Sequence, residues 1–342
     1  MRSIFAQTYQ PGLLLVIDDG SSDDSPAIAD RVLAACPFPS ELVVRGRRGL
    51  SATLNEGLDR ISGDILAYVG SDDLWHPERL HYGVETLQAH PQAVAAFGPC
   101  YLIDESDLIL NIGTFATMEG HRRPPWAKRV RAPSVSLRTL LSFRTVPLSP
   151  SVTYRQAAVE RFRWNEASPM EDYEMYLLLA SVGEYAYVEQ PLGAWRLHAL
   201  GTSRKLESML DEALATQRRI AQRLGLSPGD LAACEAGVRY AYGEQFLRSG
   251  QWRKGVALTV ANVHGAPHSA TALAERVARI AATAVTASAR RGSHGSWPAQ
   301  RTAPRTALAW GRFPMNVKDK PEVARGMDQA ETGRESTGEP GN

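Results

Sequence analysis

The stretch Ile65-Leu66-Ala67-Tyr68-Val69-Gly70-Ser71-Asp72-Asp73 decides the fold, because an apolar run leads directly into two adjacent carboxylates. The run 65–69 predicts a buried strand that ends at Gly70, and a helical pattern begins near Pro77. Ligands of α/β sheets bind at the carboxyl ends of the strands. One or two carboxylates there suit Mg²⁺ or Mn²⁺ held together with substrate phosphates. The stretch therefore predicts a metal–nucleotide site, and the alternative is that both acids only cap the next helix.

A second apolar run, residues 13–17, also ends in acids, at Asp18-Asp19-Gly20. A carboxylate at this strand end could accept hydrogen bonds from a nucleobase or a ribose, although Asp-Gly is also a strong turn signal. Arg48 belongs to a short basic run that is either a solvated face or a partner for phosphate. Strands and helices alternate as far as residue 90, which predicts an α/β fold with a mostly parallel sheet flanked by helices.

The remaining segments are assigned by the period of their apolar residues. Further strands are predicted at 41–44, 93–98, 149–154 and 185–188, and a hairpin over 101–110. Helices are predicted over 26–36, 52–61, 137–143, from 171 onward and over 204–260. Residues 113–136 are predicted to form a loop or mobile lid.

Composition narrows the class of protein. The chain has 342 residues, of which 44% are hydrophobic and 22% charged, as in soluble globular proteins. Its formal charge of +1 argues against a surface built for polyanions, and therefore against nucleic acid as a partner. Three separated cysteines match no zinc or redox spacing, and no run approaches the roughly 18 apolar residues of a membrane span. We expect a cytoplasmic protein.

Two further polar motifs lie in the second half of the chain. Glu171-Asp172 follows a proline-bearing loop and opens a helix, so these acids either favour the helix start or provide a general base toward a hydroxyl acceptor. His198 ends an Arg-x-His loop. A lone histidine is more often structural, but this one gains weight if the acids at 72 and 73 need a third metal ligand.

Taken together, these motifs resemble family 2 glycosyltransferases, over about residues 1–205. The resemblance rests on Ala6-Gln7-Thr8-Tyr9, Val16 to Asp23, Gly49 to Leu58, Gly63-Asp64-Ile65 with Ser71-Asp72-Asp73, Glu171-Asp172-Tyr173 and Arg196-Leu197-His198, in that order. It implies the GT-A fold and an inverting transfer from a nucleotide-diphosphate sugar, commonly a UDP-sugar, with Mg²⁺ or Mn²⁺. The acceptor would be a hydroxyl of a polysaccharide, a lipid-linked glycan or a protein.

The resemblance also implies roles for single residues. Asp172 would be the catalytic base, with Glu171 beside it. The metal would be held by Asp72, Asp73 and His198. The nucleotide-sugar would contact Asp18, Asp19, Arg48, Asn55, Ser71 and Asp72.

The chain departs from the family pattern in two places. Gly70 stands where the family usually has another Asp, and the family's first strand and the turn after it are missing before residue 1. We therefore expect the natural protein to be longer and this form to be poorly stable or inactive, because a sheet without an internal strand leaves backbone groups unpaired. The alternatives are a non-catalytic nucleotide-sugar binding module and a metal-dependent nucleotidyltransferase.

Three regions follow: a GT-A-like domain over 1–205, a helical extension over 206–290, and a disordered tail over 291–342, where apolar periodicity fades. The amphipathic stretch 270–288 carries arginines and favours a packing or homodimer helix over a membrane-surface helix. A lipid-linked acceptor would still make peripheral attachment at the inner face of the membrane sensible.

Overall fold

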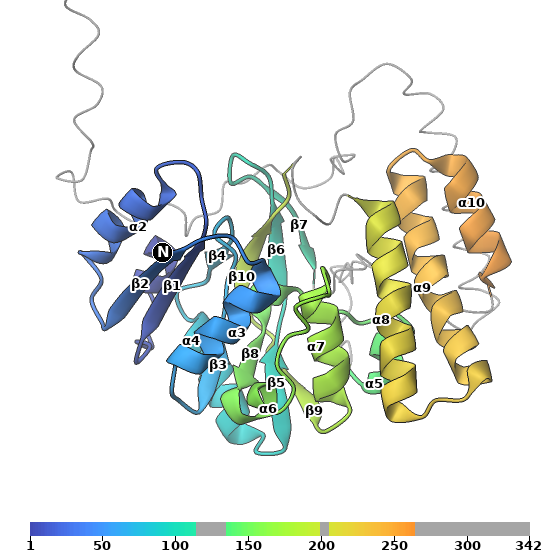
Figure 1. Ribbon diagram of the computed structural model, residues 1–342, viewed down its shortest axis with the longest axis horizontal. Helices are drawn as coiled ribbons and strands as arrows, with labels where there is room; N and C mark the ends of the chain where they lie inside the picture. Colours follow the sequence, from blue (N-terminus) through green and yellow to red (C-terminus); the bar gives the residue numbers. More distant parts are fainter. Residues whose placement is uncertain (114–134, 199–204, 264–342) are drawn as a thin grey trace, which may run out of the picture.

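The computed structural model describes residues 1–113, 135–198 and 205–263 (Figure 1). The chain opens with helix α1 (Arg2–Phe5), strand β1 (Leu14–Asp19), helix α2 (Ser25–Leu33), strand β2 (Ser40–Arg45) and helix α3 (Leu50–Arg60). β1 and β2 pair in parallel, with Leu14 opposite Ser40 and Asp19 opposite Arg45. The predicted βαβ unit is confirmed here, and it places Asp18 and Asp19 at the carboxyl end of β1.

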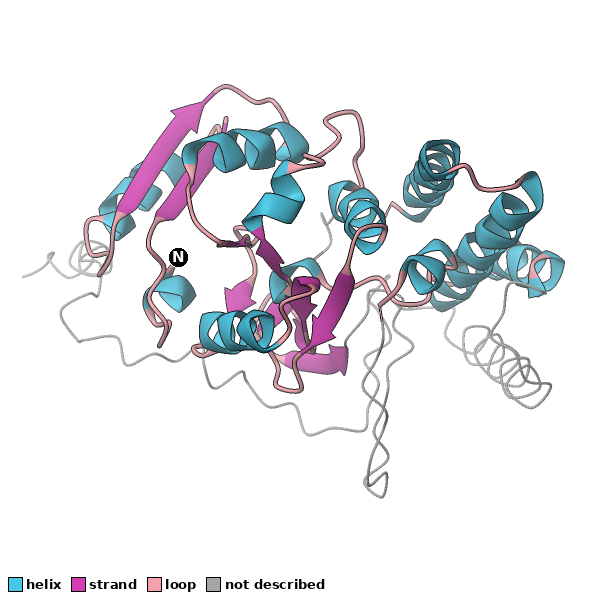
Figure 2. Cartoon of the chain, turned by 90° about the horizontal axis from the view of Figure 1, so that it is seen from below, coloured by secondary structure: helices cyan, strands magenta, loops and turns pink. Residues whose placement is uncertain are grey.

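The other strands form two sheets of four. One has the order β3 (Ile65–Ala67), β8 (Thr153–Arg155), β5 (Ala93–Phe97), β9 (Glu184–Tyr187). The other has the order β4 (Leu74–Trp75), β10 (Gly193–Arg196), β6 (Cys100–Ile103), β7 (Ile109–Gly113). No ladder joins β1 and β2 to either sheet within the described residues, and Figure 2 shows this pair set apart from the remaining strands.

The expectation of one mostly parallel sheet is wrong. β8 lies antiparallel to both β3 and β5, β4 is antiparallel to β10, and the hairpin β6–β7 is antiparallel by construction. β8 enters through the 3-10 turn η1 (Ser149–Ser151) and not through a crossover helix. The buried Arg79 on α4 (Arg79–Ala89) fixes this entry by donating to Pro150 O at 2.9 Å and Val152 O at 2.7 Å.

The main core lies around α7 (Glu171–Ala180), in which every residue from Tyr173 to Leu179 is buried. This helix packs between the β5 sheet and the helical layer, so its burial pattern is continuous and not one-sided. The short helices α5 (Leu137–Leu141) and α6 (Gln156–Glu160) pack against it. α7 therefore carries Glu171 and Asp172 on a rigid support.

The predicted helical extension is confirmed for its described part. α8 (Leu206–Leu224), α9 (Pro228–Arg248) and α10 (Trp252–Ala261) form a layer at the opposite end of the molecule from β1 and β2 (Figures 1 and 2). Close packing of α9 and α10 needs two glycines: a Cβ on Gly243 would lie 2.5 Å from Thr259 Oγ1, and a Cβ on Gly255 would lie 2.6 Å from Leu247 Cγ.

Some expectations lie outside the described residues, namely most of the loop or lid at 113–136, the stretch 270–288 and the tail at 291–342. The region boundaries at 205 and 290 and the strand before residue 1 stay predictions. No helix in the described ranges has the length and apolarity that a membrane crossing requires. All three cysteines are free thiols.

Candidate functional site

The acidic loop after β3 holds its two carboxylates side by side. The loop closes on itself through the N–H of Asp73, which donates to Gly70 O at 3.3 Å. A Cβ on Gly70 would lie 3.0 Å from Asp72 Oδ1 and 3.3 Å from Asp73 Oδ2, so these two oxygens converge over the glycine. The alternative of helix capping is wrong, because β4 intervenes and the N-cap of α4 is Glu78.

His198 joins this loop from far along the chain. Its Nε2 lies 3.0 Å from Asp72 Oδ2, across 126 residues of sequence. The backbone N–H of Arg196 donates to Asp73 Oδ1 at 2.9 Å. The three predicted metal ligands Asp72, Asp73 and His198 therefore meet at one place, at the ends of β3 and β10.

The pKa of the Asp73 carboxyl is raised well above its ordinary value. Burial raises the pKa of Asp73 to about 7, and the charge of Asp72 acts in the same direction, against the hydrogen bond from the Arg196 N–H. Asp72 itself is exposed. One carboxylate thus faces solvent while its neighbour is held inside the loop.

The donor set at this loop fits a hard divalent cation that arrives with phosphates. Within the described part of the chain, no group of three His, Cys, Asp or Glu side chains forms a preformed metal centre. A nucleotide-bound Mg²⁺ or Mn²⁺ takes only one or two protein carboxylates. The converging oxygens of Asp72 and Asp73 meet that smaller requirement.

In the second acidic loop, the Asp18 side chain forms hydrogen bonds within the loop itself. Asp18 Oδ1 accepts from the N–H groups of Gly20 and Ser21, and Asp18 Oδ2 accepts from Ser21 Oγ at 2.5 Å. The Ser21 hydroxyl, more than any other group, lowers the pKa of Asp18. Gly20 has φ 83°, as a tight turn requires. The geometry of Asp18 is that of a turn.

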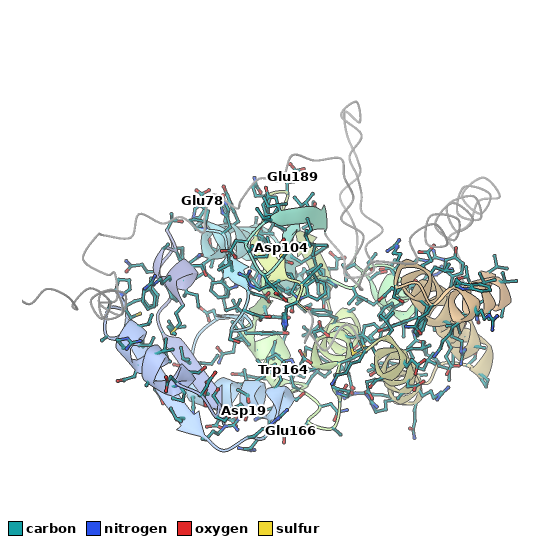
Figure 3. The ribbon with its side chains drawn as sticks, turned by 90° about the horizontal axis from the view of Figure 1, so that it is seen from above. Asp19, Glu78, Asp104, Trp164, Glu166 and Glu189 are labelled. Carbon is teal, nitrogen blue, oxygen red and sulfur yellow. The ribbon has the colours of Figure 1, made fainter. Side chains whose placement is uncertain are left out.

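Asp19 fixes the loop that leads into α3. It accepts from the N–H groups of Arg48 at 2.8 Å and Gly49 at 2.7 Å, and it forms an ion pair with Arg45. Partial burial acts to raise its pKa, but these hydrogen bonds outweigh burial and hold the pKa of Asp19 below its ordinary value. Asp19 is labelled in Figure 3. No hydrogen bond or ion pair joins it to Asp72 or Asp73 among the described residues.

Arg48 lies in this loop, and Asn55 lies in α3, which follows it. The Arg48 guanidinium is about half exposed and lies 3.6 Å from Glu56 Oε2. Asn55 is buried, and its amide donates to Trp164 O and Glu166 Oε1 while accepting from the Trp164 N–H at 2.8 Å (Trp164 and Glu166 are labelled in Figure 3). These contacts give Asn55 a structural task, whereas Ser71 is exposed beside the acidic loop. Donor contacts by the three residues stay predictions.

Glu171 and Asp172 occupy the first turn of α7, after the N-cap Met170. A helix start favours negative charge, but burial outweighs that effect and raises the pKa of Asp172 to about 6. Burial, followed by the charge of Asp172, raises the pKa of Glu171 to about 8. Burial thus raises both pKa values, and the pKa of Glu171 is raised further than that of Asp172.

The charge of this acid pair acts on three buried tyrosine hydroxyls. The rings of Tyr68 and Tyr154 stack at 6.0 Å, and Tyr68 directly precedes Val69 and Gly70. Burial and the charge of Asp172 raise the pKa values of the Tyr68, Tyr154 and Tyr176 hydroxyls, which stay neutral. Tyr68 directly follows β3, and the charges of Glu171 and Asp172 act on its hydroxyl.

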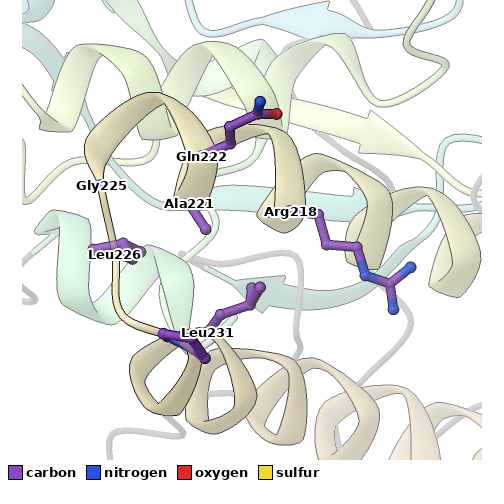
Figure 4. A pocket seen from close by; sticks show the side chains of 7 residues that line it. Arg218, Ala221, Gln222, Gly225, Leu226 and Leu231 are labelled. Atoms are coloured by element: carbon purple, nitrogen blue, oxygen red, sulfur yellow. The ribbon is translucent and has the colours of Figure 1, made fainter.

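Two residues of this site escape the sequence patterns. In the sequence, Tyr68 looks like one more residue of the apolar strand. In the structure, it lies just beyond β3, which ends at Ala67. Arg196 appears in the Arg-x-His motif, but nothing in the motif reveals that its side chain reaches two loops at once. A hollow of about 430 Å³ at the α8–α9 turn lies in the helical layer and is not part of this site (Figure 4).

A family model and several known proteins match parts of this chain. Glycosyl transferase family 2 matches residues 1–131. An uncharacterized glycosyltransferase of Rickettsia conorii is 23% identical over 217 residues, which are 62% of this chain and 33% of the relative. Glycosyltransferase GlyA of Streptococcus pneumoniae is 34% identical over 116 residues, which are 31% of this chain and 15% of the relative. The chain covers 27% to 33% of the length of the first curated relatives.

Solved structures agree on the fold. The mannosyltransferase PcManGT of Pyrobaculum calidifontis, in complex with GDP-Man and Mn²⁺, superposes with a TM-score of 0.53 at 17% identity, covering 84% of this chain and 81% of that one. TarS of S. aureus, residues 1–349 in complex with UDP-GlcNAc, has a TM-score of 0.51 at 15% identity, covering 86% and 87%. This likeness gives the chain the α/β fold of GT-A glycosyltransferases. Residues 1–131 are therefore similar to glycosyl transferase family 2.

Proposed function

We propose that this protein is an inverting glycosyltransferase that moves a sugar from a nucleotide-diphosphate sugar, a UDP-sugar, to a hydroxyl acceptor. The acceptor is a polysaccharide, a lipid-linked glycan or a protein. The observation that carries the proposal is the contact of 3.0 Å between Asp72 and His198, which come together from 126 residues apart at the carboxyl end of β3. A structural role alone would not require two exposed or half-exposed polar groups to converge at a strand end.

The donor class is supported by the ligands of the similar structures. One is a complex with UDP-GlcNAc and the other with GDP-Man, both of which are nucleotide-diphosphate sugars. The pyrophosphate end of such a donor would lie at Asp72, Asp73 and His198, with Mg²⁺ or Mn²⁺. When bound, the cation neutralises charge that develops on the leaving diphosphate. Ser71 and Gly70 leave room beside the carboxylates because both are small.

Asp172 serves as the base in this proposal. The acceptor oxygen attacks the anomeric carbon from the face opposite the diphosphate, and its proton passes to the Asp172 carboxylate. The bond between the anomeric carbon and the diphosphate oxygen breaks, and its electron pair leaves with the diphosphate. A base works best with a pKa near the working pH, and a pKa of about 6 for Asp172 meets that need.

Glu171 has a different role in the proposed reaction. Its raised pKa keeps it protonated at neutral pH, so that it lies beside the base without adding a second negative charge. The reaction is expected in the cytoplasm, with the inner face of the membrane as the place where a lipid-linked acceptor would be met.

A donor screen tests the proposal. The chain is incubated with UDP- and GDP-sugars and with Mn²⁺ or EDTA, and release of nucleoside diphosphate is followed. The proposal expects release from at least one donor, dependent on the cation and absent in Asp72→Asn. Release of pyrophosphate would indicate a nucleotidyltransferase, and donor binding without turnover would indicate a binding module; either result contradicts the proposal.

A further inference from the structure

Arg196 ends β10 at a junction between two loops. β10 pairs with β4, which follows the acidic loop, and with β6, which precedes the hairpin turn 104–108. Arg196 lies opposite Ile103 in the parallel ladder, so its side chain starts between the two loops. The guanidinium is mostly buried, with 17% of the side chain exposed.

Each nitrogen of this guanidinium contacts a different residue. Nε donates to the main-chain carbonyl of Asp72 at 2.8 Å, Nη1 to the carbonyl of Asp104 at 2.7 Å, and Nη2 to Asp107 Oδ1 at 2.6 Å. The backbone N–H of Arg196 adds its bond to Asp73. Only a planar fork of fixed geometry can make these three side-chain bonds together, and lysine offers no such fork.

The hairpin turn is itself a firm anchor. Asp104 Oδ1 accepts from the N–H groups of Ser106 at 2.8 Å and Leu108 at 3.0 Å. Asp107 has φ 62°, a left-handed conformation that Asp and Asn tolerate better than other residues with a side chain. This conformation accompanies an Asp107 carboxylate directed at Arg196, so the turn meets the guanidinium with a negative charge.

We propose that Arg196 is a positioning residue: its fork fixes the Asp72 main chain so that the Asp72 carboxylate meets His198, and Asp107 is the counter-ion that ties this loop to the β6–β7 turn. His198 lies two residues beyond Arg196, so one short segment both orients Asp72 and contacts it. The meaning of this arrangement for catalysis rests on the proposed function. The mechanical coupling of the two loops does not.

Hydrogen exchange measured by mass spectrometry tests the coupling without any ligand. Arg196→Gln is expected to speed exchange in peptides covering 70–76 and 104–108 on the order of tenfold, because hydrogen bonds to a charged donor are lost in both loops. Asp107→Asn keeps the shape and the tolerance of the left-handed conformation but removes the charge. It is expected to speed exchange over 70–76 as well, although among the described residues the Asp107 side chain is hydrogen-bonded to Arg196 and not to that segment.

The control is Arg218→Lys. Arg218 is a guanidinium that pairs with Glu235 at 2.7 Å between α8 and α9, and its replacement should leave exchange over 70–76 unchanged. If Arg196→Gln does not fold, Asp107→Asn still decides the matter. Unchanged exchange over 70–76 in Asp107→Asn and in any folded Arg196 variant would overturn the proposal.

Binding of Mn²⁺ with UDP, and separately with GDP, links the coupling to the site. Free Mn²⁺ is counted by electron paramagnetic resonance. Arg196→Gln and Arg196→Lys are expected to weaken the binding about 10- to 100-fold, the usual effect of removing a group that orients a metal ligand. Affinities equal to that of the unaltered chain would contradict a positioning role. If the unaltered chain binds no Mn²⁺ with either nucleotide, the metal part of the proposed function fails, and the exchange result still decides the role of Arg196.

Discussion

Replacing Glu171 by Gln separates the catalytic base from its neighbour, because the two acids of the pair are expected to respond in opposite ways. At neutral pH the folded chain holds Glu171 protonated, with a pKa of about 8, while the pKa of Asp172 is about 6. Glutamine resembles the protonated acid in size and in charge. Glu171→Gln should therefore keep turnover and the acid limb of the pH–rate profile near pH 6, whereas Asp172→Asn should lose turnover.

The same variant changes how stability depends on pH. Between the ordinary value of 4.5 and about 8, the folded chain keeps a proton on Glu171 that the unfolded chain releases. The unfolded state then binds fewer protons, so the free energy of unfolding falls as the pH rises through this window. The gap corresponds to an upper bound of about 5 kcal/mol. Because both residues are partly exposed, the expected fall is on the order of 1–2 kcal/mol.

Urea unfolding from about pH 5 to about pH 9 measures this fall. The unaltered chain should lose stability across the range, and Glu171→Gln should lose less than half as much. Glu235→Gln is a matched control, because ion pairs with Arg239 and Arg218 outweigh partial burial and lower the pKa of Glu235, so this residue cannot cause a loss of stability as the pH rises. Parallel curves for the unaltered chain and Glu171→Gln would refute the reasoning, and loss of turnover in Glu171→Gln would transfer the role of base to Glu171.

Three further substitutions test the structure around the site. Asn55→Ala should lower the free energy of unfolding by about 2–3 kcal/mol in urea, because it removes three hydrogen bonds to the segment 164–166; a loss confined to nucleotide affinity would contradict this. Gly70→Ala should weaken Mn²⁺ binding with UDP about tenfold at unchanged melting temperature, because its Cβ would press on Asp72 Oδ1, and equal affinity would argue against the convergence of the two acids. Arg79→Met should lower the free energy of unfolding by about 3 kcal/mol, since two buried main-chain carbonyls lose their donor. A melting temperature by calorimetry within about a degree of that of the unaltered chain would contradict this.

Local patterns were sufficient where neighbours in sequence are neighbours in space. The acids at the end of β3, the hairpin β6–β7 and the helix that starts at Glu171 follow from apolar runs and the residues that end them. The period of a strand does not reveal its partner. β8 reads like any other strand, and its antiparallel place between β3 and β5 depends on long-range contacts such as those of Arg79.

The metal end of the site was predicted as two acids and one histidine, without the groups that hold them. Arg196 contacts the main-chain carbonyls of Asp72 and Asp104, and main-chain partners leave no trace in a motif. Asn55 shows the reverse: the family resemblance implied a donor contact, yet its amide is taken up by the backbone of Trp164. Sequence reveals which groups can do chemistry, and packing decides which of them are free to do it.

The most direct test of the proposed transfer compares the unaltered chain with Asp172→Asn on one donor, measuring nucleoside diphosphate release and donor binding in the same samples. We predict that turnover falls about 10²- to 10⁴-fold while the dissociation constant of the donor changes no more than about twofold, because Asp172 acts on the acceptor hydroxyl and not on the nucleotide. Unchanged turnover in Asp172→Asn, or loss of donor binding together with turnover, would contradict the role of Asp172 as the base of a sugar transfer.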